Sequence, residues 1–287
     1  MKLLLTGDWH YTDKPPRTRT DDYISELHRK IQVLKNHNLP ILQPGDLTDT
    51  PFLSYLTFRK LLSLLQLSTI FTVRGQHDLR YRNKGNTPLD ALRDAYEFLR
   101  IADSVPYELE KNVYLYGASF EEEIPEITTK SSYNILLIHR MISPVKSEDW
   151  HEEEALSFLK KHNFDLIVSG DNHKSFEAKH LHKRLINCGS LMRSKIDQVD
   201  HKPCYYILDT KTNGLEKHFI PIVEGSKVFD MSLKEEKTER NEDLEAFVTG
   251  LSKQKEMGLN LMDNLTAYMK KNNIEEEIRD IIRENAI

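Results

Sequence analysis

The sequence predicts an α/β protein with mixed sheets, and three observations carry this prediction. Five short apolar runs each end at Asp or His, as buried strands do when their carboxyl ends hold ligands. Amphipathic helical patterns separate the early runs, which is typical of parallel β-α-β units. The last apolar runs follow one another without helices, which favours antiparallel strands. Together the patterns predict parallel strands that are extended by antiparallel ones.

The N-terminal part of the chain alternates strands and helices. Continuous apolar runs predict buried parallel strands that begin at residues 2, 41 and 69. Apolar residues at helical spacing predict helices at residues 21–36, 55–65 and 88–99. Thr87 is the expected N-cap of the third helix, and Pro88 suits its first position.

The C-terminal half changes from this alternation to consecutive strands. Strands are expected at residues 113–116, 133–139 and 166–169, with a helix at 152–162 before the last of them. After His173 we expect three strands without intervening helices, at residues 184–187, 204–209 and 215–221. The segment 212–214, with sequence TNG, is the expected hairpin turn between the last two strands.

A change of composition near residue 223 predicts two domains, at residues 1–222 and 223–287. The second is polar and rich in Glu and Lys, with helical patterns at residues 241–253, 262–271 and 274–283. We therefore expect a small, mainly helical C-terminal appendage. It is either a subdomain that packs on the rest of the chain or an element that docks a partner.

The composition is that of an ordinary globular protein, with 287 residues, 39% apolar and 30% charged. No apolar run approaches the roughly 18 residues that a membrane span needs. The N-terminus enters a strand pattern directly, so we expect no signal peptide and a cytoplasmic location, where Cys188 and Cys204 stay reduced. The net charge of −5 argues against nucleic-acid binding through a uniformly basic surface, but a local basic surface is compatible with it.

The ends of the five apolar runs carry seven side chains that suit metal ions. Three are carboxylates, three are imidazoles and one is an amide: Asp8, His10, Asp46, Gln76, His139, Asp171 and His173. Mixed nitrogen and oxygen ligands favour Mn²⁺, Fe²⁺ or Zn²⁺ over Ca²⁺. Seven ligands are too many for one ion, whereas two ions about 3.5–4 Å apart would use them all and activate water for attack on phosphorus. Asp46, central in the set, is the expected bridge between the ions.

His77 and Asp49 are predicted to supply the proton that a leaving alkoxide needs. His77 follows the expected ligand Gln76 directly. An imidazole titrates near neutral pH, which suits a general acid. Asp49 lies three residues beyond Asp46, and we expect it to hold the far ring nitrogen of His77 and keep the ring protonated.

In order along the chain the motifs read GDWH, GDLTD, GQHD, IHR and GDNH. This ordered set resembles the calcineurin-like metallophosphoesterase superfamily, over residues 1–222. Within the superfamily the chain is most similar to the nuclease subunit of SbcCD-type DNA-repair exonucleases, including phage versions. Two further segments carry this similarity, RTRTDDY at 17–23 and NCGSLMR at 187–193.

The resemblance implies an α/β/β/α sandwich of two mixed sheets flanked by helices. It implies an exonuclease, with endonuclease activity as an option, that acts in DNA repair, recombination or replication. Its partners would be DNA, an SMC-like coiled-coil ATPase subunit and a second copy of the chain. It assigns His77 as general acid and divides the ligands between two ions: Asp8, His10, Asp46 and His173 for one, and Asp46, Gln76, His139 and Asp171 for the other.

Two ligand positions depart from the family pattern. Gln76 stands where Asn is usual, and Asp171 stands where the first His of G-H-x-H is usual. Both can still offer oxygen to a metal ion. An oxygen ligand in place of an imidazole makes the second site harder, which favours Mn²⁺, with Mg²⁺ as an alternative, over Zn²⁺.

Basic residues that follow three of the motifs are expected to contact phosphates and so to position a DNA strand. These are Arg17, Arg19, Arg80, Arg82, Lys84, Lys174 and Arg193. Three aromatic residues near the same motifs, Trp9, Tyr11 and Tyr81, are candidates for stacking on unpaired bases.

Two other functions are compatible with these features. A metallophosphatase or phosphodiesterase that acts on a small molecule or a phosphoprotein would use the same metals. A scaffold that only binds DNA or a partner would not need them. The nearly complete motif set argues against the scaffold.

Overall fold

The computed structural model describes residues 1–81, 84–129, 132–145 and 153–232, and isolated positions between 266 and 279. The chain divides into two compact units, Met1–Asp230 and Met231–Ile287. The helix predicted at 241–253 lies outside the described residues, and so does most of the two helices predicted after it. The domain boundary at residue 223 stays a prediction. The sheets and the predicted site residues lie in the first unit.

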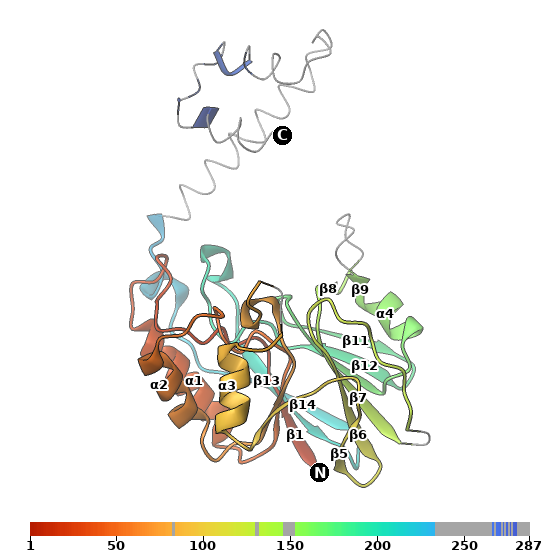
Figure 1. Ribbon diagram of the computed structural model, residues 1–287. Coiled ribbons are helices and arrows are strands. Elements are labelled where there is room, and N and C mark those ends of the chain that lie inside the picture. Colours follow the sequence, from red (N-terminus) through yellow and green to blue (C-terminus); the bar gives the residue numbers. More distant parts are fainter. Residues whose placement is uncertain are drawn as a thin grey trace. The chain divides into compact units, whose positions relative to one another are not determined.

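Two six-stranded sheets form the centre of this unit (Figure 1). The strands of the first sheet are β1 (Lys2–Leu5), β2 (Ile41–Gln43), β3 (Ile70–Thr72), β4 (Leu99–Ile101), β13 (Cys204–Asp209) and β14 (Gly214–Phe219). Those of the second are β5 (Tyr107–Glu110), β6 (Val113–Ala118), β7 (Tyr133–His139), β10 (Leu166–Gly170), β11 (Phe176–His180) and β12 (Lys183–Asn187). A short pair, β8 (Ile142–Ser143) and β9 (Glu153–Glu154), lies apart from both.

Both sheets are mixed, as predicted. The first has the order β14-β13-β1-β2-β3-β4, in which β1 to β4 are parallel and β13 and β14 are antiparallel additions. The second has the order β11-β12-β10-β7-β6-β5, in which the four inner strands are parallel and the two edge strands are antiparallel. The parallel strands of each sheet therefore all have their carboxyl ends on the same side of that sheet.

Three layers of apolar side chains hold the sheets and helices together. The helices are α1 (Tyr23–Lys35), α2 (Tyr55–Leu65), α3 (Pro88–Ala95) and α4 (Ala155–Lys161). Leu4 of β1 packs among apolar residues of α1, α2 and α3, whereas Leu3, on the opposite face of the strand, joins Leu137 between the sheets. Leu136 and Phe158 pack β7 against α4. The order of helices, sheet, sheet and helix confirms the α/β/β/α sandwich (Figure 1).

Local signals explain where the helices begin. Asp22 caps α1 by accepting a hydrogen bond from the Ser25 amide, and Ser54 caps α2 in the same way. Thr87 and Asp90 form a reciprocal capping box before Pro88 at the start of α3. Each cap satisfies amide groups that lack a partner within the helix.

Some predicted boundaries are wrong. The helix expected to reach Leu99 ends at Ala95, and Leu99 begins β4 instead. The helix expected from residue 152 begins at Ala155. Strand β11 was not predicted, so the described residues after His173 form four strands rather than three.

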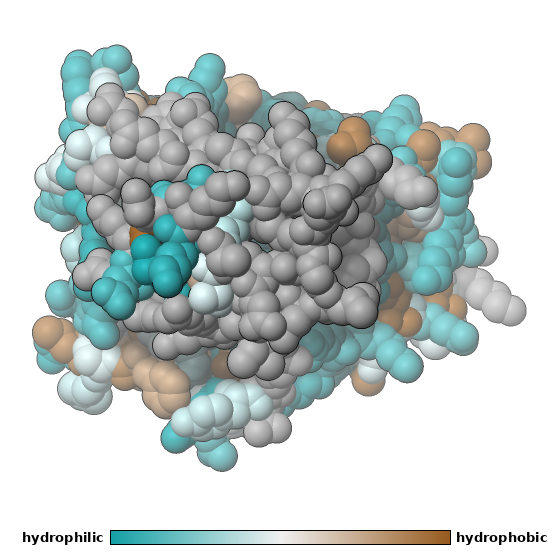
Figure 2. Space-filling view, turned by 90° about the horizontal axis from the view of Figure 1, so that it is seen from above, coloured by the Kyte–Doolittle hydropathy of each residue, from teal (hydrophilic) through white to brown (hydrophobic). Residues whose placement is uncertain are grey.

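The exposed apolar side chains lie scattered over the surface. The coloured residues on the face in Figure 2 are mainly hydrophilic, with hydrophobic ones in separate spots. Exposed apolar residues occur in different loops, for example Leu67, Val105 and Leu181. Isolated residues of this kind are normal on globular proteins. No helix in the described part of the chain is long and apolar enough to cross a membrane.

Candidate metal centre

The structure brings the seven predicted ligands together at the carboxyl ends of parallel strands from both sheets. The first sheet contributes Asp8 and His10 after β1, Asp46 after β2, and Gln76 in the 3₁₀ turn η1 (Gln76–Asp78) after β3. The second contributes His139, the last residue of β7, and Asp171 and His173 after β10. The strands that carry these residues run parallel within each sheet, and their carboxyl ends lie at the same place. Side chains that are far apart in the sequence therefore meet there.

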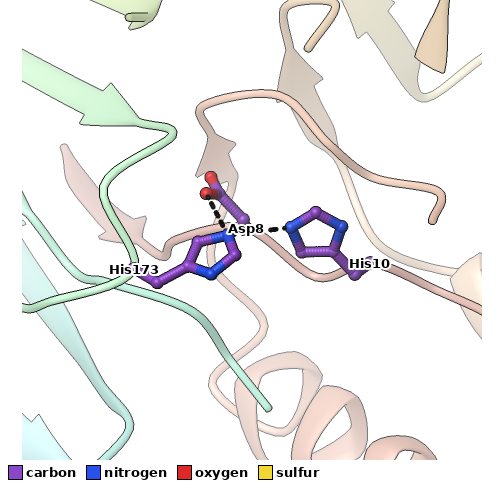
Figure 3. A group of neighbouring side chains, drawn as sticks. All are labelled: Asp8, His10 and His173. Carbon is purple, nitrogen blue, oxygen red and sulfur yellow. Dashed lines mark hydrogen bonds and ion pairs between the residues drawn. The ribbon is translucent and has the colours of Figure 1, made fainter. Parts of the chain in front are cut away.

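Asp8, His10 and His173 form one group of possible ligands (Figure 3). The two imidazoles point toward each other, with 3.1 Å between their Nε2 atoms. The His173 Nε2 atom lies 3.7 Å from Asp8 Oδ2. Each residue offers one ligand atom, and these atoms lie within 4.8 Å of one another. One metal ion would be held by this group.

Gln76, His139 and Asp171 form the second group. Gln76 Oε1 lies 2.7 Å from His139 Nε2, and the Gln76 amide nitrogen donates to Asp171 Oδ1 at 3.0 Å. The amide oxygen, the imidazole nitrogen and the carboxylate therefore converge. Gln76 and Asp171, the two departures from the family pattern, contact each other directly, so the substitutions concern one place in the site.

Asp46 lies between the two groups. Its Oδ2 atom is 3.7 Å from His10 Nε2 and 3.4 Å from His139 Nε2, while its Oδ1 atom accepts a hydrogen bond from the His77 amide. Oδ2 is buried and has no hydrogen-bond partner among the described residues. A buried carboxylate oxygen without a partner needs an explanation. A metal ion held by this oxygen would supply one, so the residues present fit the expected pair of ions.

Neighbouring groups orient two of the imidazoles. The carbonyl of Pro44 accepts a hydrogen bond from His139 Nδ1 at 2.7 Å, so Nε2 is the ring nitrogen that faces the other ligands and would bind a metal. Gln198 has its amide nitrogen 3.3 Å from His173 Nδ1. Neither Pro44 nor Gln198 was predicted to take part. Pro44 directly precedes the GDLTD motif, but nothing in the sequence marks Gln198.

Three possible ligands have an unusual backbone. His10, Asp46 and Asp171 have φ angles of 44°, 49° and 77°, in the left-handed region that L residues rarely adopt. Such conformations cluster at functional sites, where the surrounding structure enforces them. Gly45, with φ of 99°, is required for packing as well, because a Cβ atom there would lie 2.5 Å from His139 Nδ1.

The charges of the site suit a cation. Burial opposes ionisation of Asp46, but the neighbouring histidines, chiefly His139, together outweigh it and lower the Asp46 pKa to about 2. Burial likewise opposes protonation of His139, but the charge of Asp46 raises the His139 pKa to about 10. Burial raises the pKa of Asp8 to about 7, and Asp46 adds to that rise. The buried carboxyl groups of Asp8 and Asp46 thus lie beside groups that hold protons, and a bound metal ion would replace those protons.

His77 and Asp49 lie beside the metal ligands, but their contact differs from the prediction. The His77 Nδ1 atom donates to the backbone carbonyl of Asp49 at 2.8 Å, and not to its carboxylate. The carboxylate instead lies 3.3 Å from His10 Nδ1. The His77 and His10 rings are 4.8 Å apart, edge to face. Because Nδ1 is occupied, Nε2 is the atom of His77 that can pass a proton to a substrate.

The predicted DNA contacts fall into three classes. Arg17, Arg80, Lys84 and Lys174 are exposed, and Arg82 lies outside the described residues. Arg19 and Arg193 are buried, so the expectation that they contact DNA is corrected. Of the aromatic candidates for stacking, Trp9 and Tyr11 are buried and only Tyr81 is exposed.

The buried arginines instead join the two family-like segments inside the protein. Arg19 pairs with Asp21 and Glu26 and donates to the Arg193 carbonyl at 2.6 Å. Arg193 donates to the carbonyl groups of Val199 and Val223 at 3.0 and 2.7 Å. Buried cations of this kind require such partners. The network fixes the chain around Arg193.

The same network reaches the metal ligands through Leu191. Lys30, fully buried and paired with Glu26 at 2.9 Å, donates to the Leu191 carbonyl at 3.0 Å. The Leu191 amide donates in turn to the Asp8 carbonyl at 2.8 Å. The buried residues of segments 17–23 and 187–193 therefore support the metal centre.

Comparison with known proteins agrees with this geometry. The family model for calcineurin-like phosphoesterases matches residues 1–175, which include all seven possible ligands and His77. No curated protein sequence matches the chain. Among solved structures, TT1561 of Thermus thermophilus is 13% identical with a TM-score of 0.51, and the match covers 77% of this chain and 99% of that one. This likeness concerns the fold.

Two further structures are more distant. An archaeal phosphodiesterase is 15% identical with a TM-score of 0.44, over 77% of this chain and all of that one. Vps29 from Entamoeba histolytica, solved with Zn²⁺, is 14% identical with a TM-score of 0.39, over 77% of this chain and 98% of that one. These scores are too low to support an argument about activity.

Proposed function

Since the chain belongs to the calcineurin-like phosphoesterase family, we propose that it is a DNA nuclease of the SbcCD type that uses two divalent metal ions, Mn²⁺ before Mg²⁺. It would cleave phosphodiester bonds during DNA repair, recombination or replication in the cytoplasm. An SMC-like coiled-coil ATPase subunit and a second copy of the chain are its proposed partners. These partners rest on the resemblance of the sequence motifs, and size-exclusion chromatography with light scattering tests the dimer.

One observation carries the choice of DNA as substrate. The ligand cluster is open to solvent, with the His173 side chain 30% exposed, and exposed cations follow its motifs from both sheets. Lys174 follows His173 on the side of the second sheet, and Arg80 follows His77 on the side of the first. An open site between cations suits a continuous phosphate backbone, whose contacts position the strand.

The residues divide the work of phosphodiester cleavage. When bound, the ions would polarise the phosphate and lower the pKa of water. Asp46 and the two ligand groups would hold them, and the Pro44 carbonyl keeps His139 Nε2 directed inward. His77 would give its Nε2 proton to the leaving alkoxide, because the Asp49 carbonyl occupies Nδ1.

A comparison of substrates tests the proposal. With Mn²⁺ present, the protein should release nucleotides from end-labelled single- and double-stranded DNA, and it should hydrolyse p-nitrophenyl phosphate, a monoester, far more slowly. Rapid monoester hydrolysis with intact DNA would contradict the proposal and favour the phosphatase of small molecules or phosphoproteins. Metal-free protein treated with EDTA is the control, because every candidate enzyme activity needs the ions.

We propose that Gln76 and Asp171 set the metal preference. A hard carboxylate in place of an imidazole favours Mn²⁺ over Zn²⁺. In Asp171→His the ratio of Mn²⁺- to Zn²⁺-supported activity should fall about tenfold or more. Gln76→Asn should change it less, because the ligand atom stays an amide oxygen. Metal affinities measured by calorimetry check the result, and an unchanged ratio in both variants would refute this assignment.

A further inference from the structure

We propose that Phe52, Arg80 and Tyr81 form a stacking platform that binds an unpaired nucleobase of the substrate beside the metal centre. The inference rests on the proposed function as a DNA nuclease and adds a substrate class, namely DNA with an unpaired end. Such a platform would hold the strand by a base as well as by its phosphates.

Arg80 contacts both aromatic side chains on the protein surface. The Arg80 guanidinium lies 5.1 Å from the centroid of the Phe52 ring and 5.6 Å from that of Tyr81. These distances are typical of cation–π contacts, which hold a guanidinium and a ring together. Phe52 is nevertheless 58% exposed and Tyr81 79% exposed. The aromatic surface is therefore ordered by Arg80 and still open to a ligand.

The platform lies next to the proposed general acid. Asp49 and His77 join two loops through the hydrogen bond from His77 Nδ1 to the Asp49 carbonyl. Phe52 comes three residues after Asp49, and Arg80 three residues after His77. Three extended residues span at most about 10 Å. A base on the platform would therefore belong to a nucleotide close to the bond that is cut.

The backbone at Tyr81 presents its ring outward. Tyr81 has a φ angle of 52°, which is uncommon for a bulky residue. Leu67 has a similar φ of 67° and is 97% exposed, but it lies before β3, whereas His77 lies after that strand. What distinguishes Tyr81 is its contact with Arg80 and its place beside the general acid. Leu67 is thus a matched control.

The chemistry of the platform favours an unpaired base. Aromatic rings stack on any base, and a planar guanidinium both stacks on rings and pairs with phosphate. Within a duplex, neighbouring base pairs cover both faces of each internal base, so an internal base must leave the helix to reach the platform. The platform would therefore select frayed or single-stranded ends without reading their sequence.

The experiment compares two single-stranded oligonucleotides, one intact and one with abasic residues at its terminal positions. The wild type should cleave the intact strand about 10- to 100-fold better in kcat/KM. The double variant Phe52→Leu/Tyr81→Leu should cleave the intact strand as slowly as the abasic one. Tyr81→Phe should retain the preference because the ring remains, and Leu67→Ala should behave as wild type.

Further measurements separate the possible outcomes. Unchanged Mn²⁺ affinity and an unchanged circular dichroism spectrum in the double variant would show that the metal centre and fold are intact. Cleavage of both oligonucleotides at equal rates by the wild type, or a preference retained by the double variant, would overturn the platform. If the wild type cleaves no DNA at all while it hydrolyses small phosphate esters, the proposed nuclease function fails instead.

Discussion

Replacing Asp46 by Asn should abolish hydrolysis, with kcat/KM lowered by at least about 1000-fold on every substrate. Asp46 Oδ2 faces both His10 and His139, so this one carboxylate serves both proposed ions. An amide has the same shape but lacks the negative charge that compensates two divalent cations. The count of bound Mn²⁺ ions per chain, measured by calorimetry, should fall from two to one or none.

The substitution is designed to spare the fold. The amide oxygen of Asn can still accept the hydrogen bond that Asp46 Oδ1 receives from the His77 amide. Asp94→Asn, which changes an exposed carboxylate on α3, is the control and should bind two ions and cleave DNA normally. A folded Asp46→Asn variant that keeps both ions and most activity would contradict the bridging role.

The layers of the fold were predictable because the pattern of apolar residues in a strand indicates which of its faces are buried. Leu3, Leu4 and Leu5 are buried on both faces of β1, which the unbroken apolar run indicates. Strand β11 escaped prediction because it lies at a sheet edge and is half exposed, so its sequence FEAKH contains no apolar run. Leu99 fits the helical spacing of α3, but the backbone leaves the helix at Tyr96.

The candidate site was predictable to the extent that its residues follow strands. A strand end fixes where a side chain begins, and parallel strands bring these ends together. The position of a residue after a strand does not determine which neighbouring atom binds a histidine ring. The backbone carbonyl groups of Asp49 and Pro44 were therefore not predicted as partners of His77 and His139. Backbone groups carry no sequence signal.

The positive charge of a residue did not predict whether it is exposed, whereas the spacing of the motifs predicted which possible ligands lie together. Arg19 and Arg193 have the same sequence context as exposed basic residues, because both follow metal motifs. Only the tertiary structure shows that Glu26 and several carbonyl groups surround them. Long cationic side chains are rarely buried without partners, and those partners lie far away in the sequence.

Replacing His77 by Ala should lower DNA cleavage by about 10²- to 10⁴-fold, the usual contribution of a general acid. A diester with a p-nitrophenolate leaving group should lose less than about tenfold, because this group departs without a proton. The contrast between the substrates identifies the proton donor, whereas loss of a metal ligand would slow both equally. Asp49→Ala should cost less than His77→Ala on DNA, because it keeps the backbone carbonyl that accepts from Nδ1.

His77 also lies near enough to His10 and Asp46 to be considered as a metal ligand, so the same variant decides between two roles. If His77 is the general acid, the Ala variant keeps both Mn²⁺ ions and loses much more activity on DNA than on the p-nitrophenyl diester. If His77 is a metal ligand, the Ala variant binds one ion fewer, and its activity on the two substrates falls by similar factors. We expect the first result, because the hydrogen bond from Nδ1 to the Asp49 carbonyl leaves Nε2 as the ring nitrogen that can give a proton.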